Sequence, residues 1–256
     1  MNFEQTSFIG IAPTAGKRDI SYASIDRELN LASVEVGDLD AVIDFVSGHK
    51  NAFVAICGPR LPNQGLMKRD EYRATLNPEP HKGRWVEYRV ADYLLQIRKI
   101  SMPRTPAKVE DCSSAMQNSI TLFQQLAEMG FQLFSESQVQ RQAMEVNSYA
   151  AYAILLECLP YPKTSLEGRL QRQLKLYDLG LEISDPMRVF EEITRYKIIQ
   201  GVLSLEGLYS AYELDALVAA YTAWTAGEHP ERISMIGDPQ EGQIVLPVKV
   251  LKTTYQ

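Results

Sequence analysis

The sequence predicts a mixed α/β fold, and three observations support that prediction. Residues 7–12, 19–26 and 29–36 are consecutive apolar or alternating runs, which is typical of short strands. A segment with helical spacing and marked ends follows at 38–48. Residues 52–57 then form a continuous apolar run, as expected for a strand buried on both faces. A three-strand meander, a helix and a buried strand together predict a sheet that mixes antiparallel and parallel pairing.

The first three strands are separated by short breaks. The run at 7–12 ends at the turn-rich tetrad Pro13-Thr14-Ala15-Gly16. Residues 19–26 alternate as a half-buried strand does, and the short break Arg27-Glu28 precedes the strand at 29–36.

The helix at 38–48 carries signals at both ends. Asp38 is suited to cap its N-terminus, and Gly48 is suited to stop it. Its apolar residues recur at helical spacing: Leu39, Val42, Ile43 and Val46.

Beyond residue 57 the chain is loop-like to about residue 84 and then largely helical. We expect a helix near 85–97, a second from Ser113 or Ser114 to Gly130, and strands at 142–147 and 244–246. Three further helices carry start and stop signals: a capping box at Thr164 and Glu167 with a stop at Gly180, Asp185-Pro186 with a stop at Gly201, and a capping box at Ser210 and Glu213 with a stop at Gly227.

The composition is that of an ordinary globular protein, with 45% hydrophobic and 23% charged residues in a chain of 256. No repeat divides the chain, so we expect a single domain over 1–256 with a helical insertion at about 59–140. The net charge of −6 argues against a broad basic surface that coats nucleic acid or an anionic membrane. The net charge does not exclude a local basic groove.

The sequence also predicts a cytoplasmic protein without a membrane partner. The cysteines Cys57, Cys112 and Cys158 are too few and too scattered for a disulfide framework or a zinc ribbon. The first residues lack the pattern of a signal peptide, and no apolar run approaches the roughly 20 residues that span a bilayer. The composition does not indicate an oligomeric state.

Two carboxylates stand where acidic residues are unusual. Asp215 lies in a helical segment that is apolar on nearly every side, and burying an unpaired carboxylate costs several kcal/mol. We therefore expect Asp215 to have a cation, a set of donors or a metal ion beside it, or to lie at an exposed edge. Glu145 lies on the predicted strand at 142–147, where acidic residues are depleted.

The familiar catalytic motifs are missing from the sequence. The run from Gly10 to Lys17 resembles a P-loop, but its spacing is one residue too long, Arg18 replaces the hydroxyl residue, and a strand follows. The three histidines are isolated, and no G-x-S-x-G elbow is present. The strand–turn–strand opening is shared with actin-like sugar kinases, which keeps an actin-like phosphotransferase as an alternative. That fold pairs two related lobes, whereas the second half of this chain is helical.

Four longer segments form a recognisable set in order along the chain: FIGIAPTAG at 8–16, GPRLPNQGLM at 58–67, TSLEGRLQRQ at 164–173 and ELDALVAAYTA at 213–223. Together they resemble the family called domain of unknown function 429, whose members are regarded as predicted nucleases with an RNase H-like fold. The resemblance spans most of the chain and implies an RNase H-like mixed sheet with a helical insertion and a helical C-terminal half.

The resemblance also implies a catalytic site. In the family, carboxylates at the ends of adjacent elements hold Mg²⁺ or Mn²⁺ for attack on a phosphodiester. Asp215 and Glu145 are the implied catalytic residues and metal ligands. Ala12 stands where a Gly-Ile-Asp pattern is expected, and Cys57 stands where many members carry an acid. A thiol is a poor ligand for Mg²⁺, so we expect metal binding to be weak or absent in this chain.

Five polar residues are candidates for binding a substrate: Arg60, Asn63, Gln64, Arg169 and Arg172. Guanidiniums match phosphate oxygens, and amides can contact a base edge or a sugar hydroxyl. The alternative is that the arginines cap helix ends or pair with acidic neighbours.

The sequence therefore favours a metal-dependent nuclease or phosphodiesterase acting on nucleic acid, with an incomplete metal site. A non-catalytic module of the same fold that binds nucleic acid or protein is the alternative. We expect Ala12, Cys57, Glu145 and Asp215 to converge on one cleft at the end of the sheet.

Overall fold

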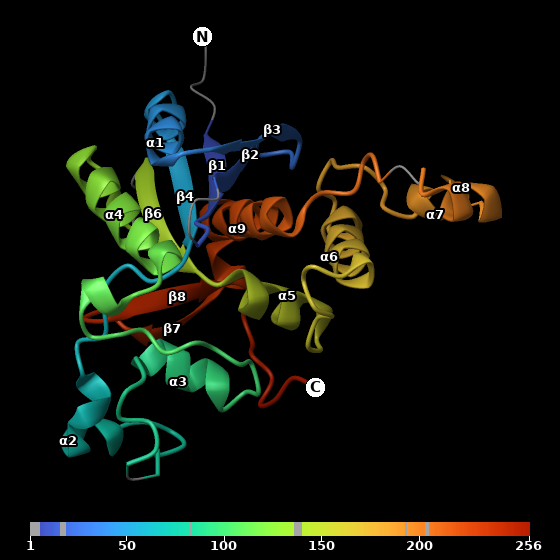
Figure 1. Cartoon of the computed structure of the whole chain (residues 1–256). Coiled ribbons are helices and arrows are strands. Elements are labelled where there is room, and N and C mark those ends of the chain that lie inside the picture. The colour runs from blue at the N-terminus through green and yellow to red at the C-terminus, as the bar shows by residue number, and fades with distance from the viewer. Residues whose placement is uncertain (1–5, 16–18, 82, 136–139, 193, 203–204) are drawn as a thin grey trace.

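A computed structural model of the chain describes residues 6–15, 19–81, 83–135, 140–192, 194–202 and 205–256. Within these residues the strands form one eight-stranded sheet with helices on both faces (Figure 1). The strands are β1 Ser7–Ala12, β2 Ile20–Ile25, β3 Leu31–Gly37, β4 Ala52–Cys57, β5 Gln132–Leu133, β6 Arg141–Val146, β7 Ser234–Asp238 and β8 Gly242–Leu246. The predicted α/β class with a mixed sheet is confirmed.

The order of the strands is β3-β2-β1-β4-β6-β8-β7, and β5 pairs with β6. The first three strands form an antiparallel meander, and β7 pairs antiparallel with β8. The pairs β1–β4, β4–β6 and β6–β8 are parallel. The segments that the sequence assigns to the meander therefore form one side of the sheet, with β3 at its edge, and the predicted buried strand β4 lies at the centre.

The helices are α1 Leu39–Ser47, α2 Asp70–Arg73, α3 Val90–Gln96, α4 Ser114–Glu128, α5 Ser148–Leu156, α6 Leu166–Asp178, α7 Arg188–Glu192, α8 Arg195–Gln200 and α9 Ala211–Glu228. Three 3₁₀ turns lie at Leu66–Lys68, Val109–Asp111 and Pro230–Arg232. No helix in this part of the chain is long and apolar enough to cross a membrane.

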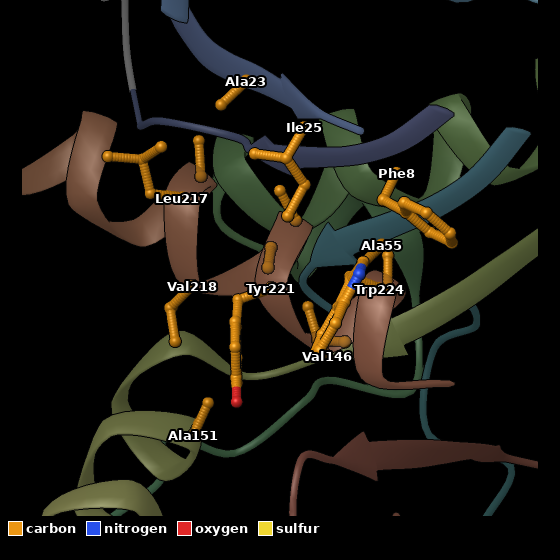
Figure 2. Close-up of a cluster of buried hydrophobic side chains, with 14 of the residues drawn as sticks. Phe8, Ala23, Ile25, Ala55, Val146, Ala151, Leu217, Val218, Tyr221 and Trp224 are labelled. Carbon is orange, nitrogen blue, oxygen red and sulfur yellow. The ribbon is translucent and has the colours of Figure 1, made fainter. Parts of the chain in front are cut away.

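Two apolar layers sandwich the sheet. On one face, Val42 of α1 and Leu122 of α4 share a buried cluster with Ile9 of β1. On the other face, α9 crosses the central strands (Figure 1). Figure 2 shows side chains of this second layer, which come from the strands (Phe8, Ile25), from α9 (Leu217, Tyr221) and from α5 (Ala151).

Capping confirms several of the predicted helix ends. Asp38 accepts a hydrogen bond from the backbone N–H of Ala41 at 2.9 Å and caps α1. Ser210 and Glu213 form the complete capping box predicted for α9. The capping box predicted at Thr164 and Glu167 is wrong by one residue, because Ser165 has the extended backbone of a cap and accepts from the N–H of Gly168.

Other boundaries differ from the sequence prediction. The helix expected over 85–97 begins only at Val90, because Arg89 has an extended backbone and the residues before it form turns. The helix expected between Asp185 and Gly201 is divided into α7 and α8, and Thr194 caps the second. The sequence does not predict the strand β7, because Gly237, the fourth of its five residues, weakens the strand pattern. The predicted turn at Gly16 lies outside the described residues, as do Lys17 and Arg18.

A glycine determines how closely α9 approaches the sheet. A Cβ atom at Gly10 would lie 2.0 Å from the carbonyl oxygen of Ala216 and 2.3 Å from the backbone nitrogen of Ala220. Both are backbone atoms of α9 that cannot move without shifting the helix. The strand and the helix are therefore in direct backbone contact at this point.

We expect Gly10→Ala to lower the free energy of unfolding by at least about 2 kcal/mol, because overpacking a tight contact displaces backbone. Gly48→Ala is the control, since a Cβ there would lie 3.4 Å from the nearest atom and the backbone φ is −66°. That variant should change the free energy of unfolding by less than about 1 kcal/mol. Urea unfolding measures both, and equal effects of the two variants would contradict this account of the α9 contact.

Candidate functional site

Three of the four positions expected in the metal site lie together at one end of the sheet. Ile11 of β1 pairs with Ile56 of β4, so Ala12 and Cys57 end neighbouring parallel strands. Ala12 belongs to the buried cluster beneath α9. The Cys57 thiol lies 3.5 Å from the backbone oxygen of Asp215 on α9 and donates to it. The structure thus brings Ala12, Cys57 and Asp215 to the same place.

Asp215 is almost fully buried because α9 is. Fourteen of the 18 residues of this helix are buried, and the side chain of Asp215 is only 8% exposed. Its Oδ2 atom accepts a hydrogen bond from Lys163 Nζ at 2.7 Å. Lys163 precedes α6, and its ammonium also lies 4.2 Å from the ring centre of Tyr212. Of the alternatives open for Asp215, the structure therefore shows a cation from the chain itself.

Cys57 is a protonated thiol in this environment. Burial raises the pKa of the Cys57 thiol far above its ordinary value, and the nearby carboxylate of Asp215 raises it further. A neutral thiol is a weak ligand for hard cations such as Mg²⁺. Ala12 has no side-chain ligand atom. Two of the four positions therefore contribute no charge to the site.

Glu145 belongs to a different environment. Its neighbours Met144 and Val146 pack in the cluster beneath α9, whereas Ala143 packs in the cluster beneath α1 and α4. Because successive side chains of a strand alternate, Glu145 points to the face opposite α9. Its carboxylate accepts from Arg89 Nη2 at 2.6 Å and from Arg89 Nη1 at 3.1 Å. The two carboxylates expected to share metal ions thus each have a separate cation.

The Arg89–Glu145 pair is the centre of a buried polar network. Arg89 Nη2 also donates to Asp92 Oδ1 at 3.1 Å, and Thr105 Oγ1 donates to Asp92 Oδ2 at 3.0 Å. The backbone N–H of Arg60 donates to Glu145 at 3.0 Å. Although burial alone lowers the pKa of Arg89, the carboxylates of Glu145 and Asp92 outweigh it and raise that pKa well above its ordinary value. The network joins β6 to α3 and to the loop after β4.

A second buried carboxylate supports the same region. Glu241 Oε1 accepts from the backbone N–H of Leu66 at 2.9 Å, and Glu241 Oε2 accepts from the N–H of Val90 at 3.0 Å. Its side chain therefore fixes the first turn of α3 against the hairpin of β7 and β8. Both carboxylate oxygens of Glu241 thus accept hydrogen bonds from backbone N–H groups.

Two cavities lie on either side of Glu145. One, of about 230 Å³, is lined by Arg60, Phe134, Glu145 and Met235 among others. The other, of about 200 Å³, lies at the carboxyl ends of β4 and β6 and is lined by Cys57, Glu145 and Arg89 among others. Cys57 and Glu145 therefore border one cavity. The polar atoms of Glu145 and Arg89 that face these cavities are already bonded to one another.

The residues present do not fit a Mg²⁺ or Mn²⁺ site. Such ions prefer several oxygen ligands in octahedral geometry. Asp215 is paired with Lys163, Glu145 is paired with Arg89, and Ala12 carries no oxygen. In the part of the chain that the structure describes, no three side chains of His, Cys, Asp or Glu gather closely enough to hold a metal ion.

The candidate substrate residues of the first loop serve mainly its own structure. Asn63 is buried, donates to the carbonyl of Glu87 at 3.0 Å and accepts from the N–H of Gly65 at 2.7 Å. Arg60 is half-buried and donates to the carbonyl of Pro239 at 2.8 Å. Gln64 is exposed and donates to the carbonyl of Pro62.

The two candidate arginines of α6 also bind backbone carbonyls. Arg169 donates to the carbonyls of Tyr209 at 2.8 Å and Leu208 at 2.7 Å, just before α9 begins. Arg172 is 1% exposed and donates to the carbonyls of Tyr161 and Gly168. These contacts hold α6 against the segments that precede α6 and α9, in line with the capping alternative.

Sequence reasoning did not single out Lys163 and Arg89 as partners of the two carboxylates. The buried position of Asp215 indicated that a cation was needed but not which one. Lys163 is 52 residues from Asp215, and Arg89 is 56 residues from Glu145. No local spacing connects residues so far apart.

The fold and the site define an α/β protein whose two buried site carboxylates are neutralised by cations of the same chain. Comparison of the chain with protein-family models, with curated proteins and with solved structures finds no match.

Removal of one partner of the Arg89–Glu145 pair should destabilise the protein strongly. We expect Arg89→Met to lower the free energy of unfolding by about 3 kcal/mol or more, since it leaves the carboxylates of Glu145 and Asp92 buried without their cation. We expect Glu145→Gln to cost less, about 1–3 kcal/mol, since Arg89 keeps its ion pair with Asp92 but loses its charged bonds to Glu145. The double variant should cost about 1–3 kcal/mol less than the sum of the two.

The control for this cycle is the exposed pair of Lys68 and Glu87, whose charged atoms lie 3.2 Å apart. Lys68→Met should change the free energy of unfolding by less than about 1 kcal/mol. Urea unfolding gives all of these values. Additive effects of the Arg89 and Glu145 variants would contradict the coupling of these two side chains.

Proposed function

We propose that this chain is an RNase H-like protein in which metal-dependent nuclease chemistry is lost, and that it acts as a non-catalytic binding module. The resemblance to domain of unknown function 429 supplies the fold and the position of the former site. The side chains at that position support the loss of catalysis, because they do not form a set of metal ligands.

The strand order supports the fold that we propose. The meander β3-β2-β1 is continued by the parallel strands β4 and β6, and α9 lies across β1. The first motif of the resemblance contains β1, the second follows β4, and the fourth lies in α9. These motifs meet at Ala12, Cys57 and Asp215, although they are far apart in the sequence. The strands described form one sheet, which does not support the two-lobed phosphotransferase alternative.

The observation that carries the proposal is the 2.7 Å contact between Lys163 Nζ and Asp215 Oδ2. Among the described residues, the ammonium compensates the one carboxylate at the junction of Ala12, Cys57 and α9. A divalent ion placed there would meet one carboxylate, a protonated thiol and a methyl group, and it would be repelled by the lysine. The site therefore favours the ammonium group of Lys163 over a bound metal ion.

A protein partner fits the surface better than nucleic acid does. The net charge is −6, and the guanidiniums of Arg60, Arg169 and Arg172 donate to backbone carbonyls. Nucleic acid affinity depends on cations that are free to neutralise phosphates.

The first test is metal binding and cleavage by the unchanged chain. We expect no saturable heat in calorimetric titration with Mg²⁺ or Mn²⁺. We also expect no cleavage of single- or double-stranded DNA or RNA above that seen with a chelator. Magnesium-dependent cleavage that Asp215→Asn abolishes would overturn the proposal.

The second test rebuilds the site. The variant Ala12→Asp/Lys163→Ala supplies a second carboxylate and removes the resident cation, so it should bind Mn²⁺ at least about tenfold more tightly than Ala12→Asp alone. Ala12→Asn/Lys163→Ala is the control of equal size and should not bind Mn²⁺. Circular dichroism confirms that each variant is folded. A folded double variant that binds no metal would mean that the former site is not at Ala12 and Asp215.

A further inference from the structure

A segment between α6 and α9 projects from the body of the protein and is apolar on its outside. Its described part comprises residues 185–192 and 194–202, contains α7 and α8, and is called the arm below (Figure 1). Val189 is its one large hydrophobic residue that is buried among those described. The arm is therefore attached to the body mainly at its base.

The exposed apolar residues of the arm are large and close together. Each is between 46% and 71% exposed: Met187, Phe190, Tyr196, Ile198, Ile199 and Val202. Single exposed apolar residues are ordinary on protein surfaces, whereas a contiguous group marks an interaction site. In this chain the group falls within 16 residues.

Within the part of the chain that the structure describes, no packed surface covers the helix α8. It has six residues, and none of them is buried. Helices this short are not stable alone in water and depend on tertiary packing of an apolar face. Because its isoleucines face solvent, the surface that stabilises α8 has to come from another molecule.

The charges of the arm indicate what that molecule is. Three acidic residues, Asp185, Glu191 and Glu192, are balanced by three basic ones, Arg188, Arg195 and Lys197. The arm is thus neutral on a chain of net charge −6, which disfavours nucleic acid and anionic lipid as partners. Glu191 and Arg195 are exposed, and neither has an ion-pair partner among the described residues.

The two helices of the arm carry opposite charges on either side of their junction. Glu191 lies near the end of α7, and Arg195 begins α8. A dimer with twofold symmetry uses the same surface twice, so a residue of one copy meets its complement on the other. Antiparallel pairing of two arms places Glu191 of each copy beside Arg195 of the other and covers both sets of isoleucines. We propose that the arm is a dimer interface whose occupant is the arm of a second copy of this chain.

Sedimentation velocity and light scattering test the oligomeric state of the full chain. We expect a mass that rises with concentration toward twice the 28.9 kDa of the single chain. Ile198→Ser/Ile199→Ser should remain monomeric at the same concentrations and keep the circular dichroism of the folded chain except for the contribution of the six residues of α8, because both side chains are exposed in the monomer. A single species of 28.9 kDa at every concentration would overturn the proposal.

Charge reversal tests the pairing itself. Glu191→Arg and Arg195→Glu should each weaken dimerisation at least about tenfold, because the reversed residue of each copy then meets a like charge on the other, which gives two repulsive contacts per dimer. An equal mixture of the two variants should form a heterodimer, since both contacts between unlike chains become attractive. Lys249→Glu is the control, because it makes the same charge change as Arg195→Glu at an exposed position outside the arm.

Native mass spectrometry distinguishes the outcomes of the mixing experiment. A heterodimer that exceeds both homodimers supports the proposed pairing. Dimerisation that neither reversal weakens, or association of the unchanged chain with a different protein only, contradicts it. The result is independent of metal binding and cleavage, so this inference and the proposed function can fail separately.

Discussion

The direct contact between the backbones of α9 and β1 at Gly10 is the constraint on which the rest of the structure depends. Without a side chain at Gly10, α9 settles onto the sheet so closely that a Cβ there would lie 2.0 Å from a helix carbonyl. Nearly the whole circumference of α9 is then covered, by strands on one side and by α5 and α6 on the other. A helix packed in this way has almost no solvated face, so any charge on it needs a partner inside the protein. Asp215 is that charge, and Lys163 is its partner.

The two buried carboxylates of the expected site, Glu145 and Asp215, are neutralised in different ways. Arg89 and Glu145 are both almost fully buried, and the guanidinium makes two bonds to the carboxylate while it also binds Asp92. Lys163 is 40% exposed and makes one bond to Asp215. Desolvation of a buried pair is offset only where geometry and further hydrogen bonds are good, which is the case for the arginine network. The arginine pair therefore orders the chain around β6, whereas the lysine pair is the more accessible of the two.

This difference explains why a carboxylate on a central strand is a poor guide to catalysis in this protein. Glu145 has the sequence features that suggest a catalytic or metal-binding role, because it lies on a buried strand among apolar residues. In the structure each of its oxygens accepts from Arg89, and one of them also accepts from the backbone of Arg60. Glu145 is buried there because its carboxylate holds together three segments that are distant in sequence: β6, the residue before α3 and the loop after β4. Asp215 has a similar sequence setting but lies beside Ala12 and Cys57, so the same pattern has two different structural causes.

Much of the fold was predictable because its signals are local. Alternation predicted the strand at 19–26, and side-chain caps predicted the starts of α1 and α9 from residues within three positions of each end. The one-residue error at α6 arose because Thr164 and Ser165 are both good caps, and only the backbone decides between them. The candidate site was less predictable. Its carboxylates could be found from local context, but the cations that neutralise them lie more than 50 residues away and come from loops without a pattern.

The contrast between α8 and α9 shows a further limit of local signals. Both segments are rich in apolar residues, and both begin with a side-chain cap, yet α9 is covered by the sheet and α8 is exposed along its whole length. What separates them is whether the rest of the chain supplies a surface. For α9 the strands around Gly10 provide one. For α8 the described part of the chain provides none, so its exposed apolar residues are explained by a surface outside the chain. The neutral, self-complementary charge of the arm makes a second copy the simplest source of that surface.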